Sequence, residues 1–397
     1  MGSVQLPSTG ALTPPATPTI TRHRGQSFPS SPPQAITSLA QHDQSPSLGV
    51  PKEFPVGTQD YDMDIAKPLG TGLWSNVFLA IPSSPSTTAS DLTPPVTPVK
   101  SEHSRFESST TAPPRAYAIK MPAGRSAKAV LLAEAKALSQ LSSIPNSQDH
   151  VVPFYGYDPR NGALVLEALP QSLEDYVLQQ LNPLDAATRS SSLTALFPSW
   201  AFSLAKSLAW LHDTTNFVHA DIKPGNILLK PTSSLPCSDA ITSSHNDFKP
   251  LYADFSASFH LTAPPEKPTA GATWDFMAPE QLSSNRELSA PTPASDVYAL
   301  AVTLLFVIIG DSPFAAAGSN RILKRHMIAQ GDAMGFAINN DNVARQRLED
   351  LEGRLEGRCD VGRVLRMALK KSKEERPRAE QMADWLEVDL GDPPHAL

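Results

Sequence analysis

The sequence predicts an α+β protein of two lobes, a small β-rich lobe with one helix followed by a larger helical lobe. Two observations carry this prediction. Short apolar runs bounded by turn residues fill the first part of the chain, whereas runs with helical spacing dominate after residue 172. The 39 prolines among the 397 residues crowd into a few segments, so the folded part is expected to be shorter than the chain.

Four apolar runs predict strands in the first lobe, because each is short, rich in large apolar residues and closed by turn residues. They cover residues 63–70, 76–81, 116–121 and 163–169. Residues 127–141, AKAVLLAEAKALSQL, instead repeat apolar side chains at helical spacing, which predicts a helix. We expect this lobe over about residues 59–168, as a small sheet with one helix.

Helical spacing predicts the second lobe, which we expect over about residues 169–390. The expected helices cover residues 172–181, 199–213, 297–309, 321–330, 361–369 and 379–388. The most apolar of them, VYALAVTLLFVII, is too short to cross a bilayer and lies between Asp296 and Asp311. It is therefore expected as a buried helix of the core.

Charge and cysteine content argue against several classes of protein. The net charge is −7, and no basic run of the kind that binds nucleic acid or an anionic membrane is present, so neither partner is expected. Cys237 and Cys359 have no CxxC spacing and no histidine cluster beside them, which argues against a disulfide framework or a zinc site. A reducing compartment fits best, so we expect a cytoplasmic protein, with entry into the nucleus left open.

Three segments of low complexity lie outside the predicted core. Residues 1–58 are expected as a disordered tail, residues 83–114 as an insertion in the first lobe, and residues 231–246 as an insertion in the second. The first two contain repeated Ser-Pro and Thr-Pro pairs, such as Thr13-Pro14. Two interpretations stay open for these pairs: they belong to plain linkers, or proline-directed kinases phosphorylate them.

The stretch HADIKPGN, residues 219–226, places polar chemistry directly before an apolar run. Asp221 offers a carboxylate that can accept a proton, Lys223 can balance phosphate charge, and the amide of Asn226 can bind a metal ion. This combination is typical of a loop that catalyses phosphoryl transfer, and it resembles the HRDxKPxN motif of eukaryotic protein kinases.

Two motifs in the first lobe resemble the same family. LGTGLWSNVFLA contains Gly70-x-Gly72-x-x-Ser75-x-Val77, which is similar to the glycine-rich loop that covers ATP phosphates, although a single match of this kind is weak. AYAIK places a lysine, Lys120, at the end of an apolar strand, like the kinase VAIK lysine. The family's ion-pair partner would be Glu134, in the helix that follows.

The second lobe continues the family's order of motifs. ADFSAS resembles the DFG segment, with Asp254 as the magnesium ligand, and residues 278–280 are identical to the APE motif. Asp296 stands where the family has an aspartate that braces the catalytic loop. Arg376 stands where the family has an arginine that pairs with the APE glutamate, here Glu280.

The resemblance implies a protein-kinase fold over residues 59–390, with ATP and Mg²⁺ as cofactors and a protein carrying a Ser or Thr acceptor as substrate. The implied catalytic residues are Asp221, Lys223, Lys120, Glu134 and Thr273, and the implied magnesium ligands are Asn226 and Asp254. The implied nucleotide-binding residues are Leu69, Gly70, Gly72, Val77, Ala118, Lys120, Glu167, Leu169 and Leu228. Within the loop, His219 is expected to pack and order the chain, since the aspartate is the base in this reaction class.

Two residues favour the serine/threonine branch of the family. Lys223 lies two residues after the presumed base Asp221, and Thr273 precedes the APE motif at the position that contacts both of them in that branch. Gly225 stands where kinases that prefer basic substrates often carry a glutamate. A preference for basic substrates is therefore not favoured.

Three positions depart from the family pattern. Ala220 replaces the arginine of HRD, so no guanidinium at that position can hold a phosphate on the activation segment. We therefore expect activity that does not depend on phosphorylation of that segment through this arginine. Ser256 replaces the DFG glycine, which is expected to restrict rotation of Asp254. Ser75 replaces the third glycine of the loop, a milder change.

Two other functions remain open. In a kinase-fold scaffold the altered loops would no longer catalyse phosphoryl transfer, and the Ser/Pro-rich segments would recruit partners. A small-molecule kinase of the aminoglycoside or choline type would share only the H-x-D-x-x-P-x-N pattern. The APE motif, together with Thr273, Asp296 and Arg376, argues against this second alternative.

Overall fold

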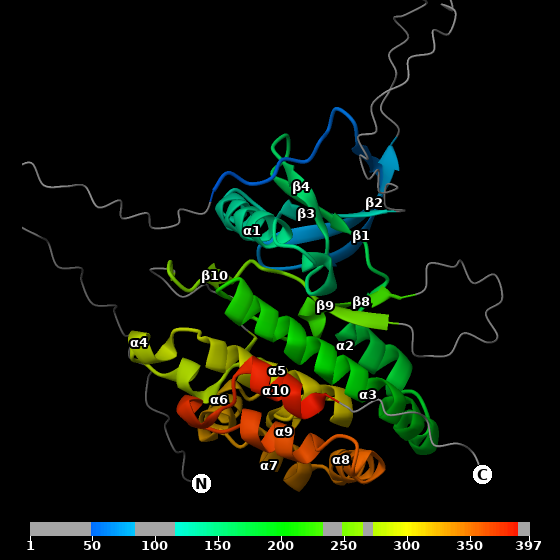
Figure 1. Cartoon of the computed structure of the whole chain (residues 1–397), viewed down its shortest axis with the longest axis vertical. Helices are drawn as coiled ribbons and strands as arrows, with labels where there is room; N and C mark the ends of the chain where they lie inside the picture. Colours follow the sequence, from blue (N-terminus) through cyan, green and yellow to red (C-terminus); the bar gives the residue numbers. More distant parts are fainter. Residues whose placement is uncertain (1–48, 84–115, 233–247, 265–272, 388–397) are drawn as a thin grey trace, which may run out of the picture. The chain divides into compact units, whose positions relative to one another are not determined.

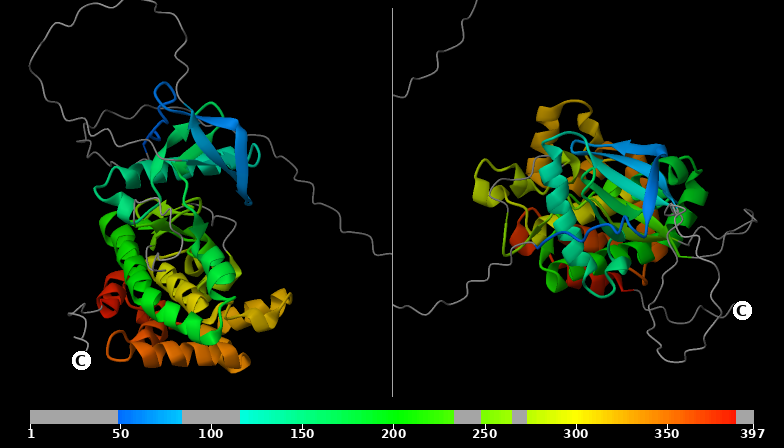
Figure 2. Two further views of the ribbon diagram at one scale, coloured as in Figure 1. Left: turned by 90° about the vertical axis from the view of Figure 1, so that its right-hand side faces the viewer. Right: turned by 90° about the horizontal axis from the view of Figure 1, so that it is seen from above.

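The computed structural model describes residues 49–83, 116–232, 248–264 and 273–387. The chain divides into two units, Met1–Gln44 and Ser45–Leu397, and every described residue belongs to the second. Within this unit a sheet-rich lobe precedes a helical lobe (Figures 1 and 2). The predicted α+β fold class, with two lobes in that order, is confirmed.

The first lobe is a five-stranded antiparallel sheet in the order β1-β2-β3-β5-β4, with the helix α1 packed against it (Figure 2). Strands β1, β2 and β3 pair in chain order, and β5 lies between β3 and β4. The bounds are β1 Asp60–Thr71, β2 Ser75–Ser83, β3 Tyr117–Pro122, α1 Ala127–Ser142, β4 Phe154–Asp158 and β5 Ala163–Glu167.

Alternation along β5 divides its side chains between two cores. Ala163 and Val165 belong to a small core that contains Ile119 of β3 and no residue of α1. Leu164, between them, belongs to the large core together with Leu131 of α1. Because successive side chains of a strand point to opposite faces, this one apolar strand joins the sheet to the helix.

Residues 49–58 correct the predicted boundary of the disordered tail. The ring of Phe54 is buried in the small core, and its backbone N–H donates to the carbonyl oxygen of Tyr157 at 2.9 Å. The backbone N–H of Lys52 donates to Oγ of Ser139 on α1 at 2.7 Å. The prediction of disorder up to residue 58 was therefore wrong over its last ten residues, because one buried ring and a few hydrogen bonds order a segment of polar composition.

The second lobe packs around α5 (Pro293–Ile309), in which every residue from Ser295 to Ile309 is buried. A capping box at Thr292 starts this helix, and Gly310, with φ 85°, ends it. The predicted core helix is thus confirmed. The other helices of the lobe are α2 Leu173–Tyr176, α3 Ala186–Ala209, α4 Arg286–Ser289, α6 Arg321–Gln330, α7 Ala333–Asn340, α8 Asn342–Leu355, α9 Val361–Ala368 and α10 Ala379–Leu386.

Two small sheets lie where the second lobe meets the first (Figure 1). They are β6-β8-β9 and β10-β7, with bounds β6 Gln171–Ser172, β7 Phe217–Val218, β8 Ile227–Pro231, β9 Phe248–Tyr252 and β10 Phe259–His260. Strand β8 begins one residue after Asn226, and β9 ends two residues before Asp254. Because Ile227 pairs with Tyr252, this hairpin brings the two predicted magnesium ligands to the same edge.

Several elements differ from the sequence-based predictions. The helix predicted at 321–330 is confirmed with both ends, whereas α3 begins thirteen residues before the predicted helix at 199–213. The helix predicted at 172–181 is α2 followed by a π-helical turn. The elements that were not predicted include helices α4, α7 and α8 and strands β4 and β9.

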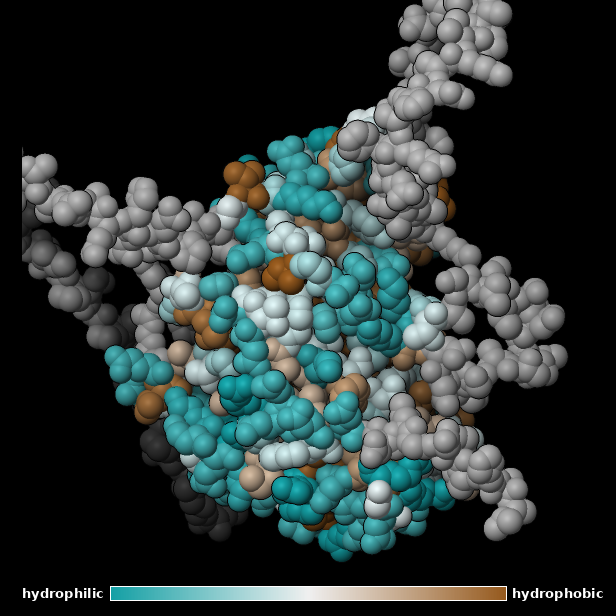
Figure 3. Space-filling view, in the orientation of Figure 1, coloured by the Kyte–Doolittle hydropathy of each residue, from teal (hydrophilic) through white to brown (hydrophobic). Residues whose placement is uncertain are grey.

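No helix among the described residues is long and apolar enough to span a membrane. The face seen in Figure 3 is largely hydrophilic, with apolar residues scattered over it. Most of the predicted tail and nearly all of the two predicted insertions lie outside the described residues, as do the Ser-Pro and Thr-Pro pairs and Cys237. The other cysteine, Cys359, is buried and free.

Candidate active site

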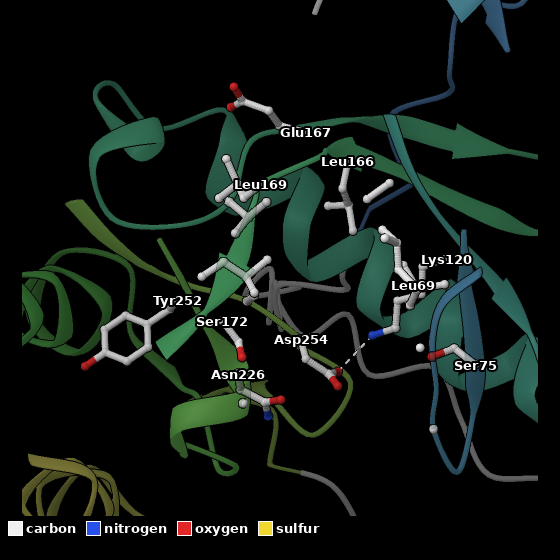
Figure 4. A pocket seen from close by; sticks show the side chains of 18 of the residues that line it. Leu69, Ser75, Lys120, Leu166, Glu167, Leu169, Ser172, Asn226, Tyr252 and Asp254 are labelled. Atoms are coloured by element: carbon white, nitrogen blue, oxygen red, sulfur yellow. Dashed lines mark hydrogen bonds and ion pairs between the residues drawn. The ribbon is translucent and has the colours of Figure 1, made fainter. Parts of the chain in front are cut away.

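A cavity of about 440 Å³ lies between the two lobes, which is within the usual range for ligand pockets. One wall comes from β1, β2 and β3, and another wall comes from the β8–β9 hairpin (Figure 4). All nine residues predicted to bind nucleotide line it: Leu69, Gly70, Gly72, Val77, Ala118, Lys120, Glu167, Leu169 and Leu228.

Packing within the chain does not require the two glycines of the β1–β2 turn. A Cβ added at Gly70 would meet no atom within 4 Å, and one at Gly72 would come no nearer than 3.6 Å, to the carbonyl oxygen of Ser75. Neither glycine has a positive φ. The missing side chains instead leave open space beside the turn, in which the N–H of Gly72 donates to the carbonyl oxygen of Ser75 at 2.7 Å. This open space fits the approach of phosphate groups to the backbone.

The opposite wall offers hydrogen-bonding groups of the backbone. Glu167 ends β5 and Leu169 follows it, and no described residue accepts a hydrogen bond from the backbone N–H of Leu169. The side chains of Val77, Ala118 and Leu228 provide apolar surface in the same cavity. A flat aromatic base with polar edges therefore fits this wall, and the cavity as a whole fits ATP.

Lys120 lies between two carboxylates. Its Nζ is 2.7 Å from Oε1 of Glu134 on α1. It is also 2.8 Å from Oδ1 of Asp254, the contact marked by a dashed line in Figure 4. The side chains of Lys120 and Glu134 are almost fully buried. The lysine thus links the sheet, the helix α1 and the segment after β9.

The charges in this cluster shift one another's pKa values. Burial lowers the pKa of Lys120, but the negative charges of Glu134 and Asp254 outweigh it and raise that pKa above its ordinary value. Burial raises the pKa of Glu134, against the attraction of Lys120. Burial would also raise the pKa of Asp254, but the charge of Lys120 holds it below its ordinary value. Asp254 therefore remains an anion at neutral pH, as a metal ligand must.

The segment between β7 and β8 holds the presumed base in a network of hydrogen bonds. Nζ of Lys223 donates to Oδ2 of Asp221 at 2.8 Å and to Oγ1 of Thr273 at 2.9 Å. Nδ2 of Asn226 donates to the same carboxylate oxygen at 2.9 Å. The structure thus brings together four predicted site residues from positions 221–273.

A buried aspartate fixes the backbone before the base. Asp296, at the start of α5, accepts hydrogen bonds from the backbone N–H groups of His219 at 2.8 Å and Ala220 at 2.9 Å. Ala220 has φ 65°, a left-handed conformation that costs energy for any residue with a Cβ. Asp296 occupies the bracing position that the resemblance implied, and its hydrogen bonds offset this strain.

Asp254 also has a left-handed backbone, with φ 58°, while the φ of Ser256 is not positive. In this conformation a serine fits without strain where the family has glycine, and its N–H donates to Oδ1 of Asp254 at 3.3 Å. His219 packs as expected: its ring lies 4.8 Å from that of Phe255, and its Nε2 donates to the carbonyl oxygen of Ala253.

The donor set suits Mg²⁺ better than a metal that requires a full protein cage. Among the described residues, no group of three or more His, Cys, Asp and Glu side chains is placed to hold a metal ion. Asn226 and Asp254 offer two oxygen ligands, and Figure 4 shows the side-chain oxygen of Asn226 on the side of Asp254. Mg²⁺ commonly takes one or two protein oxygens and completes its shell with water and phosphate oxygens.

Sequence analysis missed several residues that line the cavity, among them Val152, Ser172, Asp175 and Tyr252. A signal existed for two of them, because Ser172 and Asp175 have the spacing of a capping box and form one at the start of α2. Val152 and Tyr252 reach the cavity through tertiary packing, for which the sequence carries no local signal.

Comparisons with known proteins agree with this geometry. The family model of the protein kinase domain matches residues 109–385, more than half of the chain. The serine/threonine-protein kinase PknH of Mycobacterium tuberculosis (strain ATCC 25618 / H37Rv) is 28% identical over 185 residues, which cover 46% of this chain and 25% of PknH. The serine/threonine-protein kinase ISR1 of Eremothecium gossypii is 27% identical over 210 residues, covering 50% of this chain and 53% of ISR1.

A third relative is the dual specificity mitogen-activated protein kinase kinase sek-1 of Caenorhabditis elegans, 29% identical over 115 residues, which cover 29% of this chain and 30% of sek-1. The matched regions thus span between about a quarter and about half of the length of these relatives. The family match, the two-lobed fold and the interlobe cavity lead to one conclusion: the chain belongs to the protein kinase domain family.

Proposed function

We propose that the chain is a serine/threonine protein kinase, which transfers the γ-phosphoryl group of Mg-ATP to a hydroxyl group of a protein. The observation that carries the proposal is the position of Lys120, held between Glu134 and Asp254 at 2.7 and 2.8 Å in a cavity that fits ATP. This arrangement pre-positions the cation that would meet the phosphates, so little reorganisation is needed for catalysis.

Each group of the site has a proposed task. Asp221 would orient the acceptor hydroxyl and accept its proton, while Lys223, 2.8 Å from it, would offset phosphate charge. Asn226 and Asp254 would hold Mg²⁺, which when bound neutralises charge on the phosphate oxygens. The hydrogen bond between Lys223 and Thr273 supports the serine/threonine branch, as do the names of PknH and ISR1.

We further propose that activity does not require a phosphate on the activation segment. Ala220 offers no guanidinium, and Asp296 supplies the hydrogen bonds that order the loop at this point. Phosphatase treatment of the purified chain should therefore leave its activity unchanged. A large loss on dephosphorylation would contradict this part of the proposal.

The catalytically weak scaffold remains the second candidate, because Ala220 and Ser256 depart from the family pattern. The deciding experiment measures transfer of labelled γ-phosphate to the chain itself and to a generic basic protein. Asp254→Asn and Lys120→Met should both abolish transfer, whereas Lys128→Met, which removes an exposed lysine of α1, should not.

The result separates the two candidates. Transfer that disappears in both site variants and persists in Lys128→Met supports the kinase. Absence of transfer in the wild-type chain, with thermal stabilisation by ATP retained, supports the scaffold and would overturn the proposed activity.

A further inference from the structure

A second cavity lies in the helical lobe, between the start of α3 and the helix α8. It encloses about 280 Å³ and shares no lining residue with the interlobe cavity. Helix α8 packs against both α3 and α5 at the end of the lobe far from the sheet (Figure 1). Nothing in the proposed kinase reaction uses this place.

Two arginines on its wall reach the end of the core helix. Arg189, only 3% exposed, donates from Nη2 to the carbonyl oxygen of Val307 at 3.2 Å. Arg347 donates from Nη1 to the carbonyl oxygen of Ile309. Both acceptors belong to the last turn of α5, so the guanidinium groups cap that helix and meet the negative end of its dipole.

Capping does not satisfy all the donors of Arg189. Nε of Arg189 is buried and has no hydrogen-bond partner among the described residues. Neither Arg189 nor Arg347 has a carboxylate of the described chain within 4.0 Å of its nitrogens. Buried guanidinium groups are normally paired, because an uncompensated charge away from water is costly.

The electrostatics agree with a missing anion. Burial, and then the positive charge of Arg347, lower the pKa of Arg189 to about 10. One carboxylate, Asp350, lines the same cavity, but it already accepts a hydrogen bond from Ser190 and pairs with Arg354 at 3.4 Å. The balance of charge around the cavity is therefore positive.

Much of the rest of the wall is apolar, and part of this apolar surface is exposed. Leu193 and Leu351 are buried, whereas Leu184 is 36% exposed and Val343 is 55% exposed. Exposed aliphatic side chains beside the buried Arg189 and the half-buried Arg347 form an amphipathic surface. An inorganic ion alone would leave that apolar surface in water.

We propose that this cavity binds a small organic anion, whose carboxylate or phosphate group meets Arg189 and Arg347 and whose apolar body covers Leu184 and Val343. The guanidinium fork matches the oxygens of either head group. The volume of about 280 Å³ suits a ligand of about the size of benzoate or phenyl phosphate. The proposal does not depend on the proposed phosphoryl transfer.

The test uses the full chain and two fluorinated probes, 4-fluorobenzoate and 4-fluorophenyl phosphate, whose ¹⁹F line widths report binding. A saturating concentration of adenosine keeps the probes out of the interlobe cavity. At least one probe should broaden under these conditions, and comparison of the two identifies the preferred head group. Broadening that adenosine abolishes, or no broadening by either probe at millimolar concentration, would overturn the proposal.

Substitutions at Gln346 test the location of the site and leave Arg189 and Arg347 in place. This exposed residue lines the cavity, so Gln346→Glu should weaken binding by about threefold and Gln346→Lys should strengthen it by a similar factor. The matched control is Gln330→Glu, the same chemical change at an exposed position of α6 outside the cavity. Equal probe affinity in wild type and both Gln346 variants would place the probe elsewhere and refute the assignment.

Discussion

Arg376 and Glu280 face each other through two parallel hydrogen bonds, from Nη1 to Oε1 at 2.7 Å and from Nη2 to Oε2 at 2.8 Å. The arginine side chain is fully buried, and its guanidinium lies 4.8 Å from the centre of the Tyr298 ring. The pair that the resemblance implied therefore exists, and it ties the APE segment to the chain between α9 and α10.

Glu280→Gln should destabilise the chain by about 3–5 kcal/mol, because the change leaves the buried charge of Arg376 without its partner. Urea unfolding followed by circular dichroism measures this loss. The control is Lys249→Gln, which breaks the solvent-exposed pair with Asp149 and should cost less than about 1 kcal/mol. Similar costs for the two variants would show that the Arg376 pair is not a structural link.

Asp296→Asn should lower the free energy of unfolding by about 1–3 kcal/mol and reduce phosphoryl transfer. The reason is that each carboxylate oxygen accepts a hydrogen bond from one backbone N–H, so the NH₂ of an amide would face one of these two N–H groups. Thermal unfolding and the labelled-phosphate assay measure both effects. Ala220→Gly, which relieves a positive φ, should keep or raise the stability. A destabilised glycine variant would contradict the strain inferred at this position.

Gly156→Ala should destabilise the first lobe by about 2–4 kcal/mol. A Cβ at this position would lie 2.5 Å from the backbone nitrogen of Phe54, and φ is 154°. The segment that carries Phe54 would have to leave β4, so limited proteolysis near that residue should accelerate. Gly353→Ala is the control, because it lies in α8 with open space around it and should stabilise by up to about 1 kcal/mol. Unchanged proteolysis in Gly156→Ala would contradict the packing of the segment.

Arg160→Gln should cost about 1–3 kcal/mol at neutral pH, and this cost should shrink in acid. A hydrogen bond from Arg160 lowers the pKa of Asp60. Burial would raise the pKa of Asp158, but hydrogen bonds from Arg160 and Tyr61 outweigh burial and lower it. A carboxyl with a lowered pKa stabilises the fold above its ordinary value of 3.8 and loses that contribution as pH falls.

The pH series compares the free energy of unfolding of wild type and Arg160→Gln. The difference between them should be constant from about pH 5 to 7 and should decrease below about pH 4. A difference that does not change over the whole range would mean that Arg160 acts through packing and not through the two carboxyl groups.

The sequence predicted the helices and strands whose apolar pattern is continuous. It failed where a proline lies inside a helix and where polar residues outnumber the apolar ones. Helix α3 contains Pro198 in its interior, and because proline removes a backbone donor and usually ends a helix, the predicted helix began after it. Helix α8 is rich in charged and polar residues, so the spacing of Leu348, Leu351 and Leu355 on its buried face was overlooked.

The residues of the site were also predicted in part. Motif residues could be assigned because the family arranges them in a fixed order, and the β8–β9 hairpin places Asn226 near Asp254 as that order implies. Contacts between residues far apart in the sequence could not be predicted where no motif links them. Arg189 and Arg347 reach two carbonyls of the last turn of α5 from two different helices, and no local pattern predicts that they meet there.

The segment around Lys52 and Phe54 has a practical consequence for the choice of expression fragments. The family match begins at residue 109, yet β1, β2, the turn between them and this segment all precede that residue. A fragment trimmed to the match would expose the side of β4 and the small core to water and would lose the upper wall of the nucleotide cavity. Fragments intended for crystallisation or assay should therefore start before residue 50.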